Sequence, residues 1–587
     1  MIRYLKHLGH FWWQIVLLFG GLILQVWSSL QLPDMMSQIV NQGIVGGDQN
    51  FIMNKGLEML GVALLGGAGM IIAGFFAARV GAGLAQRIRD ELFVKVMNYS
   101  ISEINKFTTS SLITRTTNDV YQIQMTTTMV LRMSLQAPIM GVGAILKALQ
   151  NAPNMTWIIA MAVGVLTALI IVIVVFALPK FNILQKLIDK LQMVTRENLT
   201  GIRVVRAFNN EKYEQEKFDD ANTELMRVNL FVNRLMVIMF PVVGLLLNFT
   251  TLLVIWVGAG YIDTGAIEIG NMMAFMQYAM QVMMSFMFLA MAFIVIPRAM
   301  VSWKRINEVL STENSIKPAA NPIKSSSIAK GLIEFKNVDF AYPDAEAPVL
   351  NDISLTAQPG ETTAIIGSTG SGKSTLINLI PRFYDVSGGA VLVDGVDVRE
   401  MDGKELMKRI GYIPQKGLLF SGTIESNIAL GSQLDDKKMS AAAKTAQASE
   451  FINKLPHKFK SEISQGGSNI SGGQKQRLSI ARAIYKDPEI LIFDDSFSAL
   501  DFRTDRNLRQ ALAKNVKATV LIVAQRVGTI KQADQIVVID KGRVVGIGKH
   551  YDLLKTCPVY YEIASSQLSE DEMAAEMKIA DAAKGDK

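Results

Sequence analysis

Long stretches without charged residues constrain the fold of this chain more than any other feature. About 20 apolar residues are enough for a helix to cross the hydrocarbon core of a bilayer. Several such stretches occur before residue 300, and a weaker one is interrupted by Arg132 and Lys147. The predicted spans cover residues 11–33, 59–78, 128–150, 148–179, 235–262 and 269–297. Residues 1–310 are therefore predicted to form an all-α transmembrane domain with six spans and two long, helical loops.

The distribution of Lys and Arg predicts the orientation in the membrane. Basic residues precede the first span, follow the last and are frequent in the two long loops, whereas 151–156 and 263–268 contain none. Loops rich in Lys and Arg remain on the cytoplasmic side. We therefore expect a multi-pass protein of the cytoplasmic (inner or plasma) membrane with both termini in the cytoplasm. The same residues explain the net charge of +7, so no nucleic-acid partner is expected.

A row of methionines marks the sixth predicted span. Met276, Met280, Met283, Met287 and Met291 recur at helical spacing. Methionine is flexible and polarizable, so it suits a surface that accepts varied apolar ligands. The first four are candidates for a cavity that binds a hydrophobic small molecule or a lipid. The alternative is a stripe that packs against other helices or faces lipid.

The sequence pattern changes after the last span. Residues 311–330 are polar and contain prolines and serines, which is typical of a linker. Short β-branched runs alternate with helical segments over residues 331–566, which predicts an α/β domain. Residues 567–587 form a charged, alanine-rich tail, which we expect to be a solvated helix or disordered and to which we assign no function.

The α/β domain contains a phosphate-binding loop in its required context, between a predicted strand and a helix. Its glycines let backbone N–H groups close around phosphates, and the following helix directs its positive end at the anion. Lys373 is expected to contact the terminal phosphates and Ser374 to bind Mg²⁺. The predicted nucleotide-binding loop consists of Gly367, Ser368, Thr369, Gly370, Ser371, Gly372, Lys373, Ser374 and Thr375.

Two other segments complement this loop. The apolar run Ile490–Phe493 ends in Asp494, whose carboxylate is expected beside Mg²⁺. Between the two segments, Ser471-Gly-Gly-Gln474 forms a small polar turn before a helix, which is another anion-binding pattern. Because one phosphate loop needs one such helix terminus, the second is expected to serve a nucleotide held by another subunit.

Together these motifs resemble the ABC transporter superfamily, and the chain before its tail is similar to bacterial multidrug-type ABC exporter half-transporters. The resemblance implies the six-helix type I (type IV) exporter fold followed by an α/β P-loop ABC ATPase domain that uses ATP and Mg²⁺. It also implies a short amphipathic helix within residues 1–10 and coupling helices near 100–108 and 208–216. The residues that match family motifs are Ser471, Gly472, Gly473 and Gln474 (signature), Tyr342 (adenine stacking), Gln415 (Mg²⁺ contact and glutamine loop), and Ser498 and Asp501 (dimer-interface loop).

Two positions depart from the pattern of an active member. The position after Asp494 usually carries a glutamate that polarises the attacking water, but here it is Asp495, one methylene shorter. A misplacement of about 1 Å can reduce catalysis on the order of a hundredfold. The position of the switch histidine is occupied by Gln525, which can donate a hydrogen bond but has no ionisable proton. Both candidate catalytic residues are therefore expected to be impaired.

These departures affect the site where this chain supplies the phosphate loop, while its signature motif is intact. We therefore predict a heterodimer with a second half-transporter subunit, in which this chain's own site hydrolyses slowly and its signature completes the partner's active site. The alternatives are a homodimer with two slow sites and a non-transporting, ATP-gated or regulatory membrane complex. Importers of the superfamily usually keep membrane and ATP domains on separate chains, so the fusion argues against import.

Overall fold

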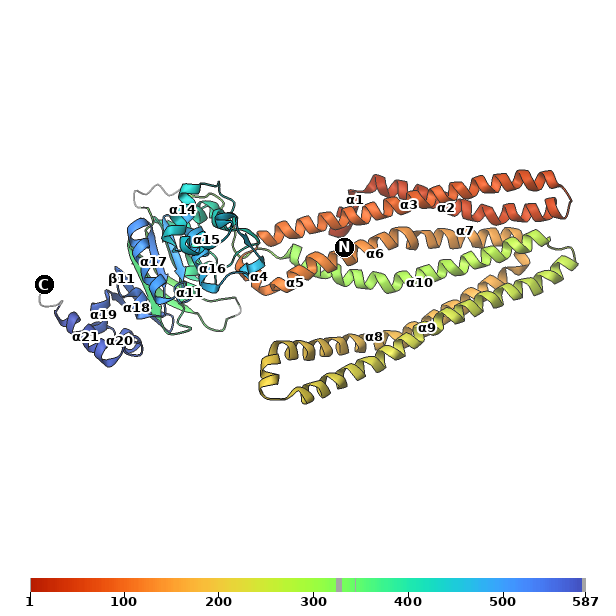
Figure 1. Ribbon diagram of the computed structural model, residues 1–587. Coiled ribbons are helices and arrows are strands. Elements are labelled where there is room, and N and C mark those ends of the chain that lie inside the picture. Colours follow the sequence, from red (N-terminus) through yellow and green to blue (C-terminus); the bar gives the residue numbers. More distant parts are fainter. Residues whose placement is uncertain (1, 324–329, 344, 583–587) are drawn as a thin grey trace. The chain divides into compact units, whose positions relative to one another are not determined.

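The computed structural model describes residues 2–323, 330–343 and 345–582 (Figure 1). The chain forms two compact units. The helical unit comprises Met1–Met97 and Thr108–Thr312, and the α/β unit comprises Asn98–Phe107 and Glu313–Lys587. An all-helical unit with six membrane-length helices followed by an α/β unit confirms the predicted fold class.

Six helical segments of the helical unit are long and apolar enough to cross a membrane, as predicted. They are Trp12–Ile44, Gln49–Met97, Thr109–Asn151, Pro153–Val172, Pro241–Asp263 and Ile269–Ser311. The predicted start of the fourth span at residue 148 is wrong, because the third segment runs to Asn151 and the next helical turn starts at Pro153. Proline has no backbone N–H and therefore cannot continue the hydrogen bonding of the preceding helix. The helices are α1 (Ile2–Gly9), α2 (Trp12–Gln38), α3 (Gln49–Met97), α5 (Thr109–Thr114), α6 (Val120–Met129), α7 (Leu135–Asn151), α8 (Thr156–Ala207), α9 (Glu211–Asp263) and α10 (Ile269–Ser311).

Helices α2 and α3 run side by side (Figure 1) and approach closely at a pair of glycines. A Cβ atom on Gly21 would lie 2.8 Å from the carbonyl oxygen of Gly69, and one on Gly69 would lie 2.7 Å from that of Gly21. Real Cβ atoms do not come so near a backbone oxygen, so both positions require glycine. Small residues at such crossings let two membrane helices pack backbone to backbone.

Lys147, which interrupts the third predicted span, is paired inside the helical unit. Its ammonium group contacts the carboxylate of Asp34 on α2. Asn151 and Tyr278 donate hydrogen bonds to the same carboxylate, at 2.7 and 2.8 Å. A charge within a membrane-length helix is tolerated where it faces a partner inside the bundle, so this network explains how the third segment can carry a lysine.

The tips of the two long loops differ. Helix α4 (Ile101–Phe107) is a separate short helix, as predicted for residues 100–108. Residues 208–210 instead form a tight turn between α8 and α9, with Asn209 at φ 52°. The segment 208–216, where a coupling helix is expected, thus consists of this turn and the first residues of α9, which begins at Glu211 and continues without interruption.

Helix α4 packs within the α/β unit. Glu103 accepts a hydrogen bond of 3.1 Å from the backbone N–H of Ser315. Ile101 contacts the apolar cluster between the two main sheets, and Asn105 bonds the hydroxyl of Tyr384. Burial opposes ionisation of Glu103, but hydrogen bonds from Ser100 and Ser315 outweigh it and lower the pKa of this carboxyl. The carboxylate therefore fastens α4 to the segment that follows α10.

Two main sheets form the α/β unit. An antiparallel sheet has the order β2-β1-β4-β5, and a larger one has the order β12-β11-β3-β10-β9-β6, in which only the edge strand β12 is antiparallel to its neighbour. The strands are β1 (Ile333–Phe340), β2 (Leu350–Ala357), β3 (Thr362–Gly367), β4 (Gly388–Val393), β5 (Val396–Asp397), β6 (Ile410–Ile413), β7 (Gly422–Thr423), β8 (Glu462–Ile463), β9 (Ile490–Asp494), β10 (Thr519–Val523), β11 (Gln535–Asp540) and β12 (Arg543–Gly548).

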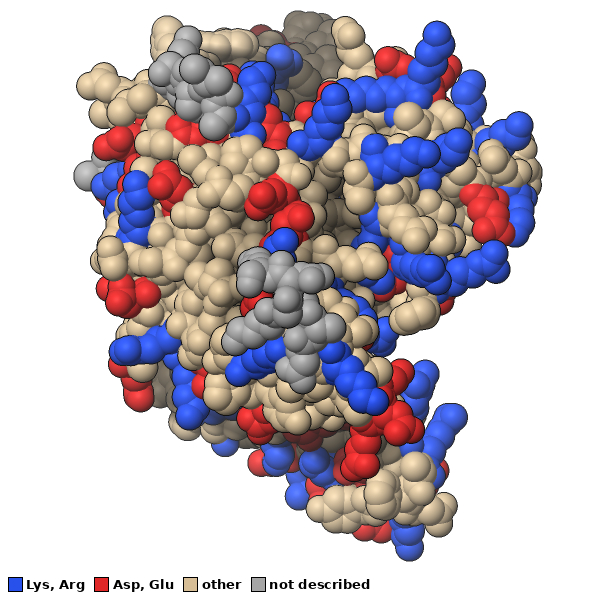
Figure 2. Space-filling view, turned by 90° about the vertical axis from the view of Figure 1, so that its left-hand side faces the viewer, with Lys and Arg blue, Asp and Glu red and all other residues tan. Residues whose placement is uncertain are grey.

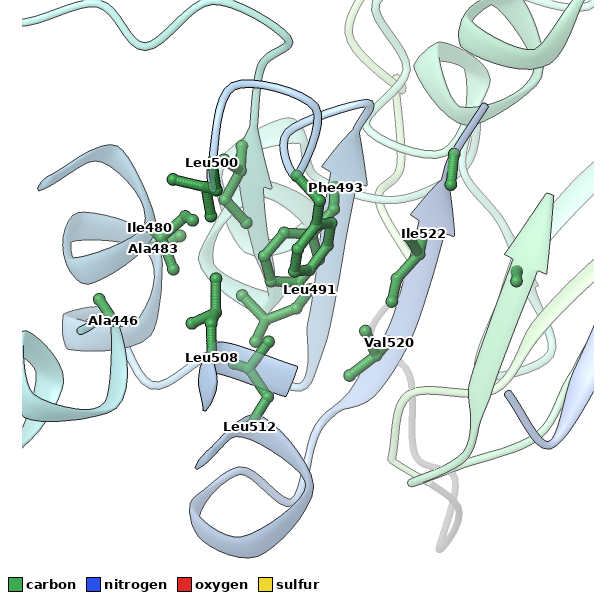
Figure 3. Packing of buried hydrophobic residues seen from close by; sticks show 14 of the residues in the cluster. Ala446, Ile480, Ala483, Leu491, Phe493, Leu500, Leu508, Leu512, Val520 and Ile522 are labelled. Atoms are coloured by element: carbon green, nitrogen blue, oxygen red, sulfur yellow. The ribbon is translucent and has the colours of Figure 1, made fainter. Parts of the chain in front are cut away.

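Helices cover the larger sheet. Strands β9 and β10 are buried along their whole length, and Figure 3 shows Leu491, Phe493 and Ile522 facing helical residues such as Leu508 and Ile480. Acidic and basic side chains are both spread over the face drawn in Figure 2. The helices are α11 (Lys373–Leu379), α12 (Gly403–Arg409), α13 (Ile424–Ala429), α14 (Asp436–Thr445), α15 (Ser449–Lys454), α16 (Gly472–Tyr485), α17 (Phe502–Asn515), α18 (Val527–Ile530), α19 (His550–Thr556), α20 (Pro558–Ser565) and α21 (Glu570–Ala582).

The C-terminal tail departs from its prediction. Residues 570–582 form α21, and this helix is not simply solvated, because Met573 and Ala580 are buried and contacts join it to α19. Met573, Met577 and Ala580 recur at helical spacing, so α21 has an apolar face that packs on the α/β unit. Residues 583–587 lie outside the described part of the chain.

Candidate nucleotide-binding site

Four loops converge because parallel strands end at the same edge of the larger sheet. Strand β3 leads into the phosphate loop, β9 ends at Asp494, and β10 ends at Val523, which is paired with Asp494 on one side and Ile365 on the other. Strand β6, beside β9, leads to Gln415. In α/β sheets, ligands bind outside these carboxyl ends, so the strand register brings together motifs that are far apart in sequence.

The phosphate loop wraps around the side chain of Lys373. Its ammonium group donates to the carbonyl oxygens of Gly367 and Ser368, at 3.0 and 2.6 Å. Gly372 precedes the helix with φ 102°, and a Cβ there would lie 2.7 Å from the side chain of Leu350, so this turn requires glycine. Burial lowers the pKa of Lys373, and the neighbouring carboxylates of Asp495 and Asp494 act in the opposite direction.

Asp494 and the hydroxyl of Ser374 meet directly. Ser374 Oγ donates to Asp494 Oδ1 at 2.7 Å. The other carboxylate oxygen accepts a hydrogen bond of 3.3 Å from the hydroxyl of Tyr412, which also donates to Asn378 at 2.9 Å. A hydroxyl and a carboxylate at this spacing provide the oxygen ligands that Mg²⁺ prefers, so these residues fit the metal expected from the sequence.

Asp495 is the meeting point of two glutamines. Its Oδ2 accepts hydrogen bonds from Gln525 Nε2 at 2.8 Å and from Gln415 Nε2 at 3.2 Å. Burial and the neighbouring charge of Asp494 raise the pKa of Asp495, against the hydrogen bond from Gln415 and the charge of Lys373. The residue also adopts φ 46°, a conformation that is uncommon outside glycine and is concentrated at functional sites.

Tyr342, the residue expected to stack on adenine, lies beside the phosphate loop. Its hydroxyl is 2.9 Å from Thr375 Oγ1, and its ring contacts Phe340 and Tyr384 edge to face.

Sequence reasoning did not select Tyr412 and Asn378 as partners of Asp494. The available signal was the position of Tyr412 three residues before Gln415, at the end of a strand that pairs with β9.

The signature residues begin α16. Ser471 Oγ accepts a hydrogen bond from the backbone N–H of Gln474 at 3.3 Å, and Gln474 Oε1 accepts one from the N–H of Ser471 at 2.9 Å. This reciprocal cap fixes the start of the helix, while Ser471 and Gly472 remain exposed. A Cβ on Gly472 would meet nothing within 4 Å. The segment therefore presents an open helix terminus.

The interface-loop residues follow Asp495. Ser498 Oγ donates to the carbonyl oxygen of Asp495 at 2.7 Å. Asp501 caps α17 by accepting a hydrogen bond of 2.9 Å from the N–H of Thr504. Hydrogen bonds from the side chain and then the backbone of Thr504 lower the pKa of Asp501. Both side chains are exposed, so they lie on the surface next to the nucleotide-binding edge.

The methionine stripe of α10 is divided between packing and an open cavity. Met280 is 51% exposed and lines a cavity of about 260 Å³. Met283 is buried against Ala162 and Leu166, and Met276 packs in a neighbouring apolar cluster. Met287 is half-buried. The cavity is lined by Gln136, Ala137, Met140, Gln277, Met280, Gln281, Met284, Ser285 and Phe288. The surface of α10 that lines the cavity is thus offset from the predicted methionine stripe, and the cavity wall contains three glutamines.

Comparisons with known proteins agree with this architecture. Residues 15–286 match the family model for the ABC transporter transmembrane region, and residues 350–498 match that for the ABC transporter. An uncharacterized ABC transporter ATP-binding protein of Mycobacterium tuberculosis is 42% identical over 92% of this chain and 93% of its own length. The ATP-dependent lipid A-core flippase of Hahella chejuensis is 30% identical over 97% of both chains.

A solved structure has the same fold. The structure of a bacterial Atm1-family ABC exporter with ATP bound is similar with a TM-score of 0.77 and 23% sequence identity, over 95% of this chain and 98% of that one.

Proposed function

Because this chain belongs to the ABC transporter family, we propose that it is one half of a heterodimeric ABC exporter in which ATP drives hydrophobic or amphipathic compounds, such as drugs or lipids, across the cytoplasmic membrane. The chain joins six apolar helices to an ABC ATPase unit, so it is a half-transporter and a multi-pass membrane protein. Both termini and the ATPase unit would lie in the cytoplasm. The observation that carries the proposal is the convergence of Asp494, Asp495, Gln415 and Gln525 beside the phosphate loop.

In the proposed site, backbone N–H groups of residues 367–375 and the ammonium group of Lys373 hold the phosphates of ATP. Ser374, Asp494 and Gln415 provide the oxygen ligands for Mg²⁺, which when bound would neutralise charge on the terminal phosphates. The direct Ser374–Asp494 contact of 2.7 Å supports this assignment, because one ion can be held by both groups. Tyr342 would stack on the adenine ring.

Hydrolysis at this site is proposed to be slow. A carboxylate that orients water must remain ionised and must reach the water, but Asp495 is short, its pKa is raised and its Oδ2 already accepts two amide hydrogen bonds. Gln525 supplies an amide where the family places a histidine. The exposed signature segment that begins at Ser471 would complete the ATP site of the second subunit, where most hydrolysis would occur.

The cavity beside Met280 supports hydrophobic or amphipathic cargo. Its wall combines methionines and Phe288 with three glutamines, so it offers both apolar contact and hydrogen bonding. One relative is named as a lipid A-core flippase, so lipids are among the candidate substrates. Drugs and lipids share this chemistry, and the transport assay below distinguishes them.

ATP hydrolysis by the purified chain, alone and after coexpression with related half-transporter subunits from its own genome, tests the proposal. We expect low activity alone and high activity with one partner. Brisk, cooperative hydrolysis by the chain alone would overturn the heterodimer and leave a homodimer. ATP-dependent accumulation of a fluorescent hydrophobic dye or a labelled phospholipid in inside-out vesicles is expected for an exporter. Hydrolysis without movement of either probe would favour the non-transporting, ATP-gated or regulatory complex.

A further inference from the structure

The connection between α20 and α21 is joined to the segment that carries Gln525. The side chain of Gln567 donates a hydrogen bond of 2.7 Å to the carbonyl oxygen of Gln525 and accepts one of 2.8 Å from the N–H of Val527. One amide group therefore holds the backbone on both sides of Arg526. Gln525, Val527 and Gln567 all belong to the α/β unit.

The C-terminal segment also holds the other end of α18. Lys531, which follows this four-residue helix, forms an ion pair with Glu576 of α21. Glu576 in turn lies 3.5 Å from the ring of the buried His550 on α19. Helix α18 is thus attached to the C-terminal segment before its first residue and after its last.

Helix α21 is itself fixed in place. Met573 and Ala580 are buried against the α/β unit, and Lys555 of α19 donates a hydrogen bond of 2.8 Å to the carbonyl oxygen of Ala580. Ser569 caps the first turn, since its hydroxyl accepts from the N–H of Glu572 at 3.3 Å. The segment that carries Gln567 is therefore held in place by the contacts of α21.

The backbone that Gln567 holds determines where the side chain of Gln525 can reach. Gln525 is exposed and lies two residues beyond the end of strand β10, so the hydrogen bonds of the sheet no longer restrain its backbone. Its amide nevertheless lies 2.8 Å from Asp495 Oδ2. The two hydrogen bonds with Gln567 supply a restraint at this point. Rotation of the peptide after Gln525 would break the bond to its carbonyl oxygen, and rotation of the next peptide would break the bond from the N–H of Val527.

We propose that Gln567 is a positioning residue for the ATP site, which holds the backbone at Gln525 so that the side-chain amide is directed toward Asp495 and the terminal phosphate. This inference rests on the proposed function, in which Gln525 occupies the switch position. The C-terminal segment after residue 566, to which the sequence assigned no function, would thereby contribute to nucleotide turnover.

Gln567 could act by positioning Gln525 or by stabilising the domain as a whole, and a double-mutant cycle distinguishes these two roles. If Gln567 acts through Gln525, its replacement slows hydrolysis only while the Gln525 amide is present. If it merely stabilises the domain, its replacement has the same effect with or without that amide. Ser569→Ala is the matched control, because it weakens the start of α21 without contacting residues 525–527.

The experiment uses the full-length chain in lipid nanodiscs, with the partner subunit where coexpression identifies one. The probe is photoreactive 8-azido-[α-³²P]ATP with Mg²⁺, and label on this chain, separated on a gel, is resolved into ATP and ADP over time. Gln567→Leu is expected to leave ATP labelling within about twofold of the parent and to slow ADP formation about tenfold, as the loss of a net hydrogen-bond contribution allows. Gln567→Glu, which keeps the acceptor but loses the donor, is expected to lie between the two.

In the Gln525→Ala background, Gln567→Leu is expected to cause no further decrease, and Ser569→Ala is expected to behave like the parent. An equal decrease in both backgrounds, an equal decrease in Ser569→Ala, or an unchanged rate in Gln567→Leu would each overturn the inference. An unchanged rate in Gln525→Ala would also overturn it, because no group would remain to be positioned. Failure of the unaltered chain to take up label would instead contradict the proposed function itself.

Discussion

Gln525 donates a hydrogen bond of 2.8 Å from Nε2 to Oδ2 of Asp495, and these are the two residues that the sequence analysis expects to depart from the pattern of an active family member. They contact each other and share one environment, which also includes Gln415 and a strained backbone at Asp495. Groups in direct contact are energetically coupled. The two departures are therefore expected to act as one unit.

Restoring both family residues should have a larger effect than the two separate changes combined. Asp495→Glu alone places a longer carboxylate against the Gln525 amide, and Gln525→His alone leaves the Asp495 carboxylate about a bond length short. We expect each single variant to change ADP formation at this chain's site less than about threefold and the double variant to raise it about tenfold or more. The photolabelling assay measures all four proteins, and a double effect equal to the product of the single effects would show that the residues act independently.

Ionised Asp495 is expected to destabilise the folded protein. Burial raises its pKa, so between the unfolded value of about 3.9 and the raised folded value the folded state binds more protons than the unfolded state. Stability from this group is then greatest at low pH and is lost as pH rises through the folded pKa. Asp495→Asn should therefore raise the apparent unfolding temperature at neutral pH, and this gain should shrink toward pH 4.

Asp501→Asn provides a comparison of opposite sign, measured by the same thermal unfolding series. The hydrogen bonds from Thr504 lower the pKa of Asp501, so its ionised form stabilises the folded state above the unfolded pKa, and this contribution is lost as pH falls. Asparagine keeps the helix cap but removes the charge. A gain in unfolding temperature at neutral pH for this variant, or its absence for Asp495→Asn, would contradict the assigned shifts.

The pair of Asp34 and Lys147 should matter most when only one partner is removed. Lys147→Met leaves a carboxylate inside the helical unit without its cation, which typically costs about 3–5 kcal/mol, whereas removing both charges is often nearly neutral. We expect Lys147→Met to lower the apparent unfolding temperature strongly in nanodiscs and Asp34→Asn with Lys147→Met to recover most of it. Lys55→Met, which breaks a pair with the exposed Glu58, is the control and should have little effect. Equal losses in the single and double variants would show that the pair is not coupled.

The sequence was sufficient for the six membrane-length helices and for the α/β unit, because span length and motif context are local properties. It could not indicate why Lys147 is tolerated, since Asp34 and Tyr278 are its neighbours only after three helices pack together. The fourth span was placed too early because an apolar run does not reveal where a helix breaks, although Pro153 was a signal.

Tertiary packing also decided the features that sequence reasoning missed. Helical spacing identified a methionine stripe on α10, but it could not say that Met283 packs against other helices while Met280 lines a cavity. The tail was expected to be a solvated helix or disordered because it is charged and alanine-rich. Met573 and Ala580 are separated by seven positions, and the burial of this face, which brings Gln567 to the backbone of Gln525, depends on a surface formed by distant segments.

The close approach of α2 and α3 predicts a large difference between two neighbouring glycines. A Cβ on Gly69 would lie 2.7 Å from the carbonyl oxygen of Gly21, whereas one on Gly67 would meet nothing within 4 Å. Gly69→Ala must therefore push the helices apart, at a cost of about 1–3 kcal/mol for overpacking. Gly67→Ala adds a methyl group to an exposed helix face and should be neutral or slightly stabilising, because alanine favours helix over glycine. Thermal unfolding in nanodiscs compares the two, and equal behaviour would mean that the α2–α3 contact is looser than its backbone distances imply.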